Sequence, residues 1–458
     1  MGENALLALH ESDIIFSSAT NDIKRALGEL KRSSLSITNR LRSIETDAAF
    51  VKSIAQACKL PLISNERCGS WYIHPDDKET SAYFKSTDGH FGQWSFNLRR
   101  LNLHILETIG RHSGCIVVDS TRRGKSMPDA LSKTVPIWIC VLNRLLFPDI
   151  EAAGTLRTPC DVVSRSEYAQ ILNRIPTFMQ AVEALKLDLA KLRHDLVGRP
   201  MKPIWITPAT DISLLDLDHD GQFHPVVLCT ASNSLNADVA SRGFYYVQGA
   251  ADDSESWAHG LEPAIFWRHH DELLKTNEDD LPEFIQGLVS SKETPELLMR
   301  SAVLVKPTTN LFIANNGAAG GEKSKYYHII ISSGPNPIAT LSNRSSDRYL
   351  HLNCSTGKTG SRQLRKELPK LTSMQAAIRS STNILVTCPS GRDFAVGIAL
   401  AILCENYSDN GTSWGPFEDT PSLSKTTIKH RLSWIMASLT DAAPSRATLQ
   451  SVNSFLLS

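Results

Sequence analysis

The segment from residue 115 to residue 125, CIVVDSTRRGK, constrains the fold of this chain more than any other stretch. It opens with four apolar residues that have the composition of a buried β-strand. A carboxylate, two hydroxyls, two guanidiniums, a glycine and an amine then follow without a break. Polar side chains just past the carboxyl end of a buried strand commonly form ligand sites in α/β sheets. The segment therefore predicts an α/β sheet with a polar site at one strand end.

The same polar run has the chemistry of an anion site. Arginine forks match phosphate bidentately, and lysine supplies a compact positive charge. One interpretation is thus an anion cradle with a single acid, Asp119, beside it. The other is a strand followed by a solvated basic turn. Residue types alone leave both open.

Length and composition set the class of protein. A chain of 458 residues exceeds one ordinary core, so two or three domains are expected. The apolar content of 41% and charged content of 21% fit a soluble globular protein. Apolar runs such as 396–403 are far too short to span a bilayer, and the first residues lack a secretory signal, so we expect no membrane association.

Cysteine usage and net charge bear on the cellular compartment and on the partners expected for this chain. The nine cysteines show no metal-ligand spacing, and several lie in apolar runs. This predicts reduced, buried thiols in a cytosolic or nuclear protein. The formal net charge is zero and heptad repeats are lacking, so a monomer is the default expectation. With balanced charge, only local patches can indicate nucleic-acid binding.

Two such basic patches occur. Residues 24–42 carry six basic side chains against one acid, and the seven-residue step from Arg25 to Arg32 puts both on one face of an expected helix. A second helix, expected over 361–378, carries Arg362, Arg365 and Lys366. Each of these side chains can meet a phosphate and release a counterion. The alternative for both helices is a solvated face.

Two further polar loops are candidate sites. Residues 85–90, KSTDGH, contain a strong Asp-Gly turn signal, and Lys85 and His90 are candidate phosphate ligands. The acidic segment GAADDSESWAHG, residues 249–260, is the best metal candidate, with Asp252 and Asp253 as oxygen ligands for Mg²⁺. An acidic surface loop with a helix cap explains the same residues.

The order of the remaining elements favours an α/β fold. Residues 58–103 read as irregular, 155–200 as a helical pair around Pro176, and 314–323 as a flexible loop. Further elements are a helix over 130–147 and strands at 202–207, 224–230, 310–314, 327–332 and 349–353.

Residues 383–403, NILVTCPSGRDFAVGIALAIL, read as a strand, a tight loop and an apolar helix. The loop can present successive backbone N–H groups at a helix N-terminus, where the dipole also favours anions. This predicts a second phosphate-binding loop, comprising Cys388, Ser390, Gly391, Arg392 and Asp393.

Three segments together resemble a known family. Residues 115–143, 246–267 and 384–403 are similar, in this order, to the characteristic blocks of the initiator-tRNA 2′-O-ribosyl phosphate transferases of fungi and plants. The resemblance implies transfer of a 5-phosphoribosyl group from phosphoribosyl pyrophosphate to the 2′-hydroxyl of a T-stem adenosine. It also implies discrimination of initiator from elongator tRNA, with Mg²⁺ accompanying the donor, in a cytoplasmic protein.

The family likeness also implies a domain plan. An N-terminal α/β (or α+β) transferase domain would span 1–290, and a dual-specificity-phosphatase-like α/β domain 300–458. Phosphatases of that fold use the motif HCxxGxxR. Here Cys388 and Gly391 fit, Thr387 replaces the histidine and Phe394 stands where the arginine belongs. Without that arginine the transition-state charge is not clamped, so we expect phosphate binding without phosphatase turnover.

Under this resemblance the polar run acquires roles. Arg122, Arg123 and Lys125 would hold donor phosphates, and Asp119 would orient the 2′-hydroxyl or help to hold Mg²⁺. Ser120, Thr121 and Gly124 would complete the phosphate contacts. The competing functions are a cysteine-class phosphatase and a non-catalytic module that binds phosphate or tRNA.

Overall fold

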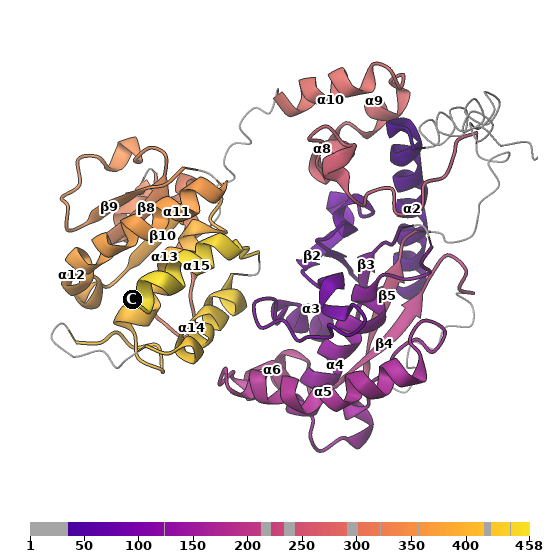
Figure 1. The fold of residues 1–458 in the computed structure, drawn as a ribbon, viewed down its shortest axis with the longest axis horizontal. Helices are drawn as coiled ribbons and strands as arrows, with labels where there is room; N and C mark the ends of the chain where they lie inside the picture. The colour runs from indigo at the N-terminus through magenta and orange to yellow at the C-terminus, as the bar shows by residue number, and fades with distance from the viewer. Residues whose placement is uncertain are drawn as a thin grey trace, which may run out of the picture.

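The computed structural model describes residues 35–122, 124–211, 221–232, 243–290, 301–320, 322–355, 357–415, 423–439 and 441–458. The roles expected for Arg25, Arg32 and Arg123 fall on residues outside these ranges. The described chain forms two α/β bodies, each built on its own five-stranded sheet (Figure 1).

All strands of the N-terminal sheet are parallel, in the order β2-β1-β3-β5-β4. Its central strand, β3, is buried at every residue, as its apolar sequence predicts. Because parallel strands end on the same side of a sheet, the residues after β1, β3 and β5 meet at one edge. The strands are β1 (Leu62–Asn65), β2 (Lys78–Ala82), β3 (Cys115–Asp119), β4 (Met201–Ile206) and β5 (His224–Thr230).

Helices cover both faces of this sheet. On one face, side chains such as Ile44 and Phe266 pack against Val118 of β3. On the other, Trp138 and Leu142 pack against Val117. The helices are α2 (Ile37–Cys58), α3 (His104–His112), a π-helical turn (Ala130–Thr134), α4 (Val135–Leu146), α5 (Arg165–Glu183), α6 (Leu189–Asp195), α8 (Pro263–Arg268), α9 (His270–Lys275) and α10 (Leu281–Ser290).

The C-terminal sheet has the order β6-β7-β10-β8-β9, with only β6 antiparallel. Its core centres on α13, which is apolar all round and almost entirely buried. The strands are β6 (Val303–Leu304), β7 (Leu311–Asn315), β8 (Ile329–Gly334), β9 (Tyr349–Asn353) and β10 (Ile384–Cys388). The helices are α11 (Gly357–Glu367), α12 (Gln375–Ser380), α13 (Phe394–Asn406), α14 (Lys425–Ser438) and α15 (Arg446–Leu456).

The strands expected from apolar runs are confirmed, but four local predictions are wrong. Residues 58–103 contain β1 and β2, which are short and polar enough to escape a search for apolar runs. Pro176 lies inside α5 rather than between two helices. The helix expected over 361–378 is interrupted by a 3₁₀ segment, Leu368–Met374, which has a proline in its first turn. The expected flexible loop at 314–323 includes a 3₁₀ turn with Ala318 and Ala319 buried.

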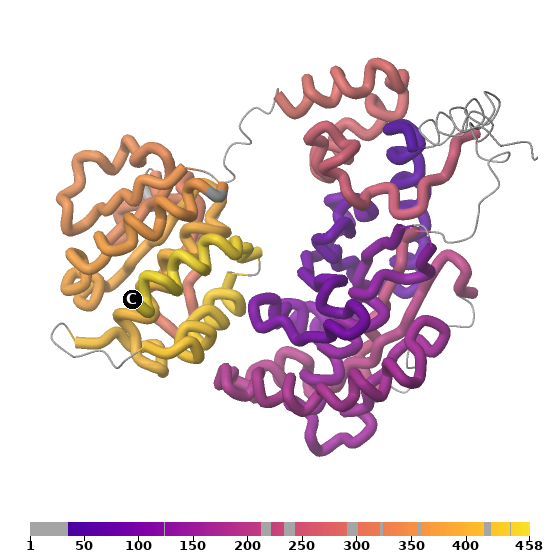
Figure 2. The backbone as a smooth tube through the Cα atoms, viewed as in Figure 1, coloured from indigo at the N-terminus to yellow at the C-terminus, as the bar shows by residue number. Residues whose placement is uncertain are grey.

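The two bodies meet through a few polar contacts. Arg100 of the first donates from Nη1 to the carbonyl of Ala442 in the second, at 2.8 Å. Lys186 Nζ lies 4.0 Å from the Asp409 carboxylate. Figure 2 shows the chain passing from a body coloured indigo through magenta to salmon pink into one coloured orange to yellow, so each sheet is built from a continuous part of the sequence. In the described ranges, every helix is too short or too polar to cross a bilayer.

Candidate active site

Asp119, the last residue of β3, is fully buried at the carboxyl edge of the N-terminal sheet. Its Oδ1 accepts hydrogen bonds from the Ser120 backbone N–H at 2.8 Å and from the Cys68 thiol at 3.0 Å. Its Oδ2 accepts from Asn65 Nδ2 at 2.8 Å. Asn65 ends β1, so two neighbouring strand ends lock this carboxylate in place. The site role predicted for Asp119 stays a prediction, and the geometry favours a positioning role.

Arg67 joins this carboxylate to the acidic segment. Its Nη2 lies 3.1 Å from Asp119 Oδ1, and its Nη1 lies 3.0 Å from Asp252 Oδ1. The guanidinium also donates to the carbonyl of Ser120. Sequence reasoning missed Arg67 because it missed β1, which ends two residues earlier. A polar residue directly after a parallel strand is the signal that would have found it.

The local electrostatics keep this arginine charged. Burial by itself lowers the pKa of Arg67, but the acidic groups around it, Cys68, Asp119 and Asp252, outweigh burial and raise that pKa. Burial raises the pKa of Asp252 above its usual value, although Arg67 opposes the shift. Burial and the charge of Asp119 raise the pKa of the Cys68 thiol well above its usual value. Cys68 is therefore a neutral donor to Asp119.

Close backbone packing seats the loop after β3 against the segment that carries Asp252. Gly249 has φ +65°, and a Cβ there would lie 2.7 Å from the Thr121 carbonyl oxygen and 2.9 Å from the Arg122 nitrogen. Only glycine fits this position, since it must tolerate both the left-handed backbone and the contact. Ser232, just past β5, completes the bracing: Thr121 N–H donates to its hydroxyl at 3.0 Å, and that hydroxyl donates to the Thr121 carbonyl at 2.9 Å.

The next residues of the run are exposed. Arg122, Gly124 and Lys125 face solvent, unlike Ser120 and Thr121, which are buried. Lys125 Nζ pairs with Asp129 at 2.7 Å, and its carbonyl accepts from Gln248 at 2.8 Å. The loop after β3 thus starts with the buried residues Ser120 and Thr121 and ends in an exposed cationic tip formed by Arg122 and Lys125. Such a tip suits binding of an anionic ligand.

The predicted polar loop at 85–90 lies against the same segment. The 3₁₀ turn Ser86–Gly89 has Lys85 and His90 at its ends. Thr134 Oγ1 donates to the Lys85 carbonyl at 3.0 Å, and His90 Nε2 lies 3.6 Å from Asp129 Oδ2. The structure therefore brings this loop and the 115–134 segment together.

The loop after β10 is bonded mostly within its own domain. Gly391 N–H donates to Cys388 Sγ at 3.1 Å, and Arg392 N–H donates to Ser390 Oγ at 3.2 Å. The Arg392 side chain pairs with Asp441 at 2.8 Å, and Asp393 accepts from the Ser445 N–H at 2.9 Å. Gly391 has φ +70° and packs on the backbone of β7. This tight turn has the expected form of a phosphate loop, but its phosphate binding remains a prediction.

Phe394 is the residue at which this loop departs from the phosphatase motif. It stands where that motif places its arginine, is 6% exposed and belongs to the core around α13. An arginine there would have to enter an apolar interior.

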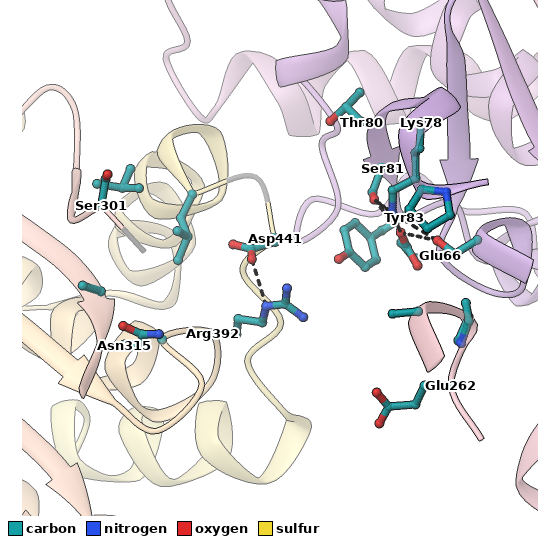
Figure 3. A pocket seen from close by; sticks show the side chains of 18 of the residues that line it. Glu66, Lys78, Thr80, Ser81, Tyr83, Glu262, Ser301, Asn315, Arg392 and Asp441 are labelled. Atoms are coloured by element: carbon teal, nitrogen blue, oxygen red, sulfur yellow. Dashed lines mark hydrogen bonds and ion pairs between the residues drawn. The ribbon is translucent and has the colours of Figure 1, made fainter. Parts of the chain in front are cut away.

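A cavity of about 900 Å³ separates the two bodies next to this loop. Gly391, Arg392 and Asp441 line one side, and Glu66 and Lys78 line the other (Figure 3). Burial raises the pKa of Glu66, but hydrogen bonds from Ser81 and the charge of Lys78 outweigh it and lower that pKa. Of the described residues, 119–122, Gly124 and Lys125 do not line this cavity. The structure thus places the two predicted phosphate loops in different surroundings.

The basic helices give a mixed result. Arg362, Arg365 and Lys366 all lie on the exposed side of α11, while Leu364 is buried, so their RNA contacts stay a prediction. Arg40, from the first basic patch, instead donates to the Ala250 carbonyl at 2.9 Å and packs over Trp257. It supports the fold.

The described residues do not form a preassembled metal cluster, and the Mg²⁺ ligand role of Asp252 and Asp253 stays a prediction. In the described part of the chain, no three His, Cys, Asp or Glu side chains form a metal-binding group. Asp253 is exposed, and Arg67 lies between Asp119 and Asp252, where its charge already compensates both carboxylates. We therefore derive no step through a metal.

Family comparisons decide the relationship of this chain to known proteins. The family description of a Rit1 N-terminal domain matches residues 30–290, more than half of the chain. The description of a Rit1 DUSP-like domain matches residues 348–456. The chain belongs to the Rit1 family. This confirms the resemblance drawn from the three sequence blocks and the two-domain α/β fold class with a phosphatase-like C-terminal part.

Two relatives support the Rit1 assignment over nearly the whole chain. A protein of Saccharomyces cerevisiae named tRNA A64-2′-O-ribosylphosphate transferase is 34% identical over 484 residues, covering 94% of this chain and 94% of the relative. An uncharacterised protein of Schizosaccharomyces pombe is 36% identical over 440 residues, covering 92% and 94%. Among solved structures, human DUSP28 is 16% identical with a TM-score of 0.26, covering 34% of this chain and 92% of its own.

Proposed function

We propose that this Rit1-family chain transfers a 5-phosphoribosyl group from phosphoribosyl pyrophosphate to the 2′-hydroxyl of a T-stem adenosine of initiator tRNA. It would thus be a pentosyltransferase acting on RNA. The support is family membership along the chain and the name of the S. cerevisiae relative. Proteins that share a fold need not share a function, so the site must carry the argument.

One observation supports this proposal most directly. Two of the family's sequence blocks, 115–143 and 246–267, meet at a cluster of charged side chains. Arg67 pairs with Asp119 of the first block and Asp252 of the second, and Gly249 packs on Thr121 and Arg122. The loop after β3 also carries two exposed cations, Arg122 and Lys125, and the Asp252 carboxylate is partly exposed. Glycosyl transfer from a diphosphate needs this combination, because one group must stabilise the leaving charge and another must receive a proton.

The reaction assigns roles to these residues. The bond between ribose C1 and the pyrophosphate oxygen breaks, and a bond from the 2′-oxygen to C1 forms. The leaving pyrophosphate takes the electron pair, and Arg122 and Lys125 would hold its charge. The 2′-hydroxyl proton would pass to Asp252, whose side chain is 11% exposed, whereas Asp119 is fully buried. The raised pKa of Asp252 suits a proton acceptor.

Mg²⁺ would accompany the donor as a pyrophosphate complex, since magnesium binds chiefly through phosphates and water. The C-terminal phosphate loop would hold a phosphate of the RNA or the donor without turnover. The phosphatase alternative is not favoured, because Phe394 fills the arginine position.

The test is to incubate the full chain with Mg²⁺, phosphoribosyl pyrophosphate and unmodified initiator tRNA, and to weigh the RNA by mass spectrometry. We expect a gain of one ribosyl phosphate, absent with elongator tRNA. Asp252→Asn should abolish most of the gain. Tight tRNA binding with no gain would instead support a non-catalytic binding module.

A further inference from the structure

A second groove between the two bodies has a composition that the site above does not explain. It has a volume of about 490 Å³. One wall comes from Asp88 and the loop 95–99, and the other from α13, α14 and α15. Its lining includes apolar side chains such as Phe96, Leu400 and Leu432, and its basic residues are Arg99, Lys425, Lys429 and Arg446.

These four cations are exposed, and within the described ranges none of them pairs with a carboxylate. Among the described residues that line the groove, the one acid is Asp88, and it already accepts hydrogen bonds from Ser95 at 3.3 Å and Asn97 at 3.0 Å. Positive charges from both domains thus converge on a groove with little negative charge to balance them.

The positions of these charges disfavour the helices that carry them. Lys425 and Lys429 are four residues apart on α14, where like charges repel. Lys425 and Arg446 each occupy the first residue of their helix, where the backbone dipole disfavours a cation. Charges that cost helix stability and have no carboxylate partner among the described residues indicate an external anion. A groove with such charges on both walls suits a polyanion better than a single small ion.

One wall of the groove is linked to the candidate active site by residue contacts. Asp88, on its wall, lies in the turn Ser86–Gly89. The residues flanking that turn contact Thr134 and Asp129, and Asp129 pairs with Lys125. The groove wall is therefore connected, through these residues, to the exposed cationic tip of the loop after β3.

We infer that this groove binds the sugar–phosphate backbone of the duplex arm of the tRNA substrate. The inference rests on the proposed function and adds to it a role for the phosphatase-like domain, as one wall of an RNA clamp. Contact is to the backbone, because double-stranded RNA is recognised mainly by shape, phosphates and 2′-hydroxyls. The groove thereby supplies affinity for RNA, and initiator discrimination comes from elsewhere.

The test compares two triple variants of the full chain. The first is Lys425→Ala, Lys429→Ala and Arg446→Ala. The control is Lys52→Ala, Arg111→Ala and Arg165→Ala, which removes the same charge from exposed helix positions that do not line the groove. Binding of initiator and elongator tRNA is measured by filter retention over a salt series, and transfer by steady-state kinetics. Circular dichroism and thermal unfolding verify that both variants fold.

We expect the groove variant to raise KM for tRNA about tenfold or more, leaving kcat within about threefold. The slope of log K against log salt should flatten by about 0.9 for each phosphate that the variant no longer neutralises. Both tRNAs should lose affinity alike. The groove variant could instead match the control variant in salt slope and in KM while the wild type transfers normally. That result would overturn the inferred RNA-binding role of the groove and leave the proposed function intact. A wild type that neither binds nor modifies tRNA overturns both. If the groove variant does not fold, Lys429→Glu alone decides by the same slope.

Discussion

The two sheets end in loops that look alike in sequence and differ in their bonding. Each central strand, β3 or β10, stops at a buried polar residue, Asp119 or Cys388, and a polar loop with a glycine at positive φ follows. The loop after β3 is braced by segments far away in sequence, through Arg67, Ser232 and Gly249. The loop after β10 bonds partly to itself, as Gly391 N–H caps the Cys388 sulfur, and otherwise to residues 441–445 of its own domain, through Arg392 and Asp393.

This difference in bonding indicates that the charged side chains at the loop after β3 are held in a fixed arrangement. Holding Asp119, Arg67 and Asp252 together requires three segments to fold correctly around buried charges, and such a network is costly unless every charge is paired. In the phosphatase-like loop the charged member of the motif is replaced by Phe394, which contributes to core packing. We therefore expect chemistry at the first loop and binding or structure at the second.

The largest effect should follow loss of Arg67. Arg67→Met leaves Asp119 buried without its main countercharge, which typically costs about 3–5 kcal/mol of folding free energy. Transfer should fall at least 100-fold. The measurements are thermal unfolding and transfer to initiator tRNA.

A double-mutant cycle separates the charge from its packing. Asp119→Asn alone should lose at least about tenfold in transfer. In Arg67→Met with Asp119→Asn the unpaired charge is gone, so part of the lost stability should return while activity stays low. Stability equal to wild type in Arg67→Met would show that this bridge contributes nothing, and the two loops would then be equivalent.

Loss of the exposed cations should reduce transfer and spare stability. Arg122→Ala or Lys125→Ala removes a charged contact to donor phosphate, worth about 1.5–3 kcal/mol, so kcat/KM for the donor should fall roughly 10- to 100-fold. Lys191→Ala is the matched control, since Lys191 is also an exposed lysine with an i,i+4 aspartate partner. Equal kcat/KM in the three variants would remove the tip from donor binding.

The pH dependence of transfer tests Asp252. A proton-accepting carboxylate works only when ionised, so activity should be lost as pH falls through its pKa. Burial raises that pKa, so the acid limb of kcat/KM should lie above pH 3.8, the ordinary value. Asp252→Asn should lose about 100-fold in rate. A wild-type acid limb that persists in its residual activity would assign the limb to another group.

How much of this was readable from sequence depended on the kind of residue. Strand β3 and the β10 loop stood out because apolar runs end abruptly in polar residues. Arg67 and Asn65 did not, because β1 has only four residues and its neighbour β2 is largely polar. The pairing of Asp252 with Arg67 joins residues 185 positions apart, and no local periodicity encodes such a distance. The function could be predicted from the family resemblance, whereas the contacts between the site residues became visible only in the folded structure.

The smallest effect should follow Cys388→Ser. This substitution tests whether the loop after β10 takes part in chemistry. Cys388 is buried, and its sulfur accepts from Gly391 N–H, a bond that a serine oxygen can also make. Transfer should therefore stay within about twofold, and a chromogenic phosphate ester should be hydrolysed by neither protein. Ser390→Ala serves as a control on the same loop. Phosphatase turnover in the wild type that disappears in Cys388→Ser would show that this loop does chemistry despite Phe394, so both strand ends would have to be treated as catalytic.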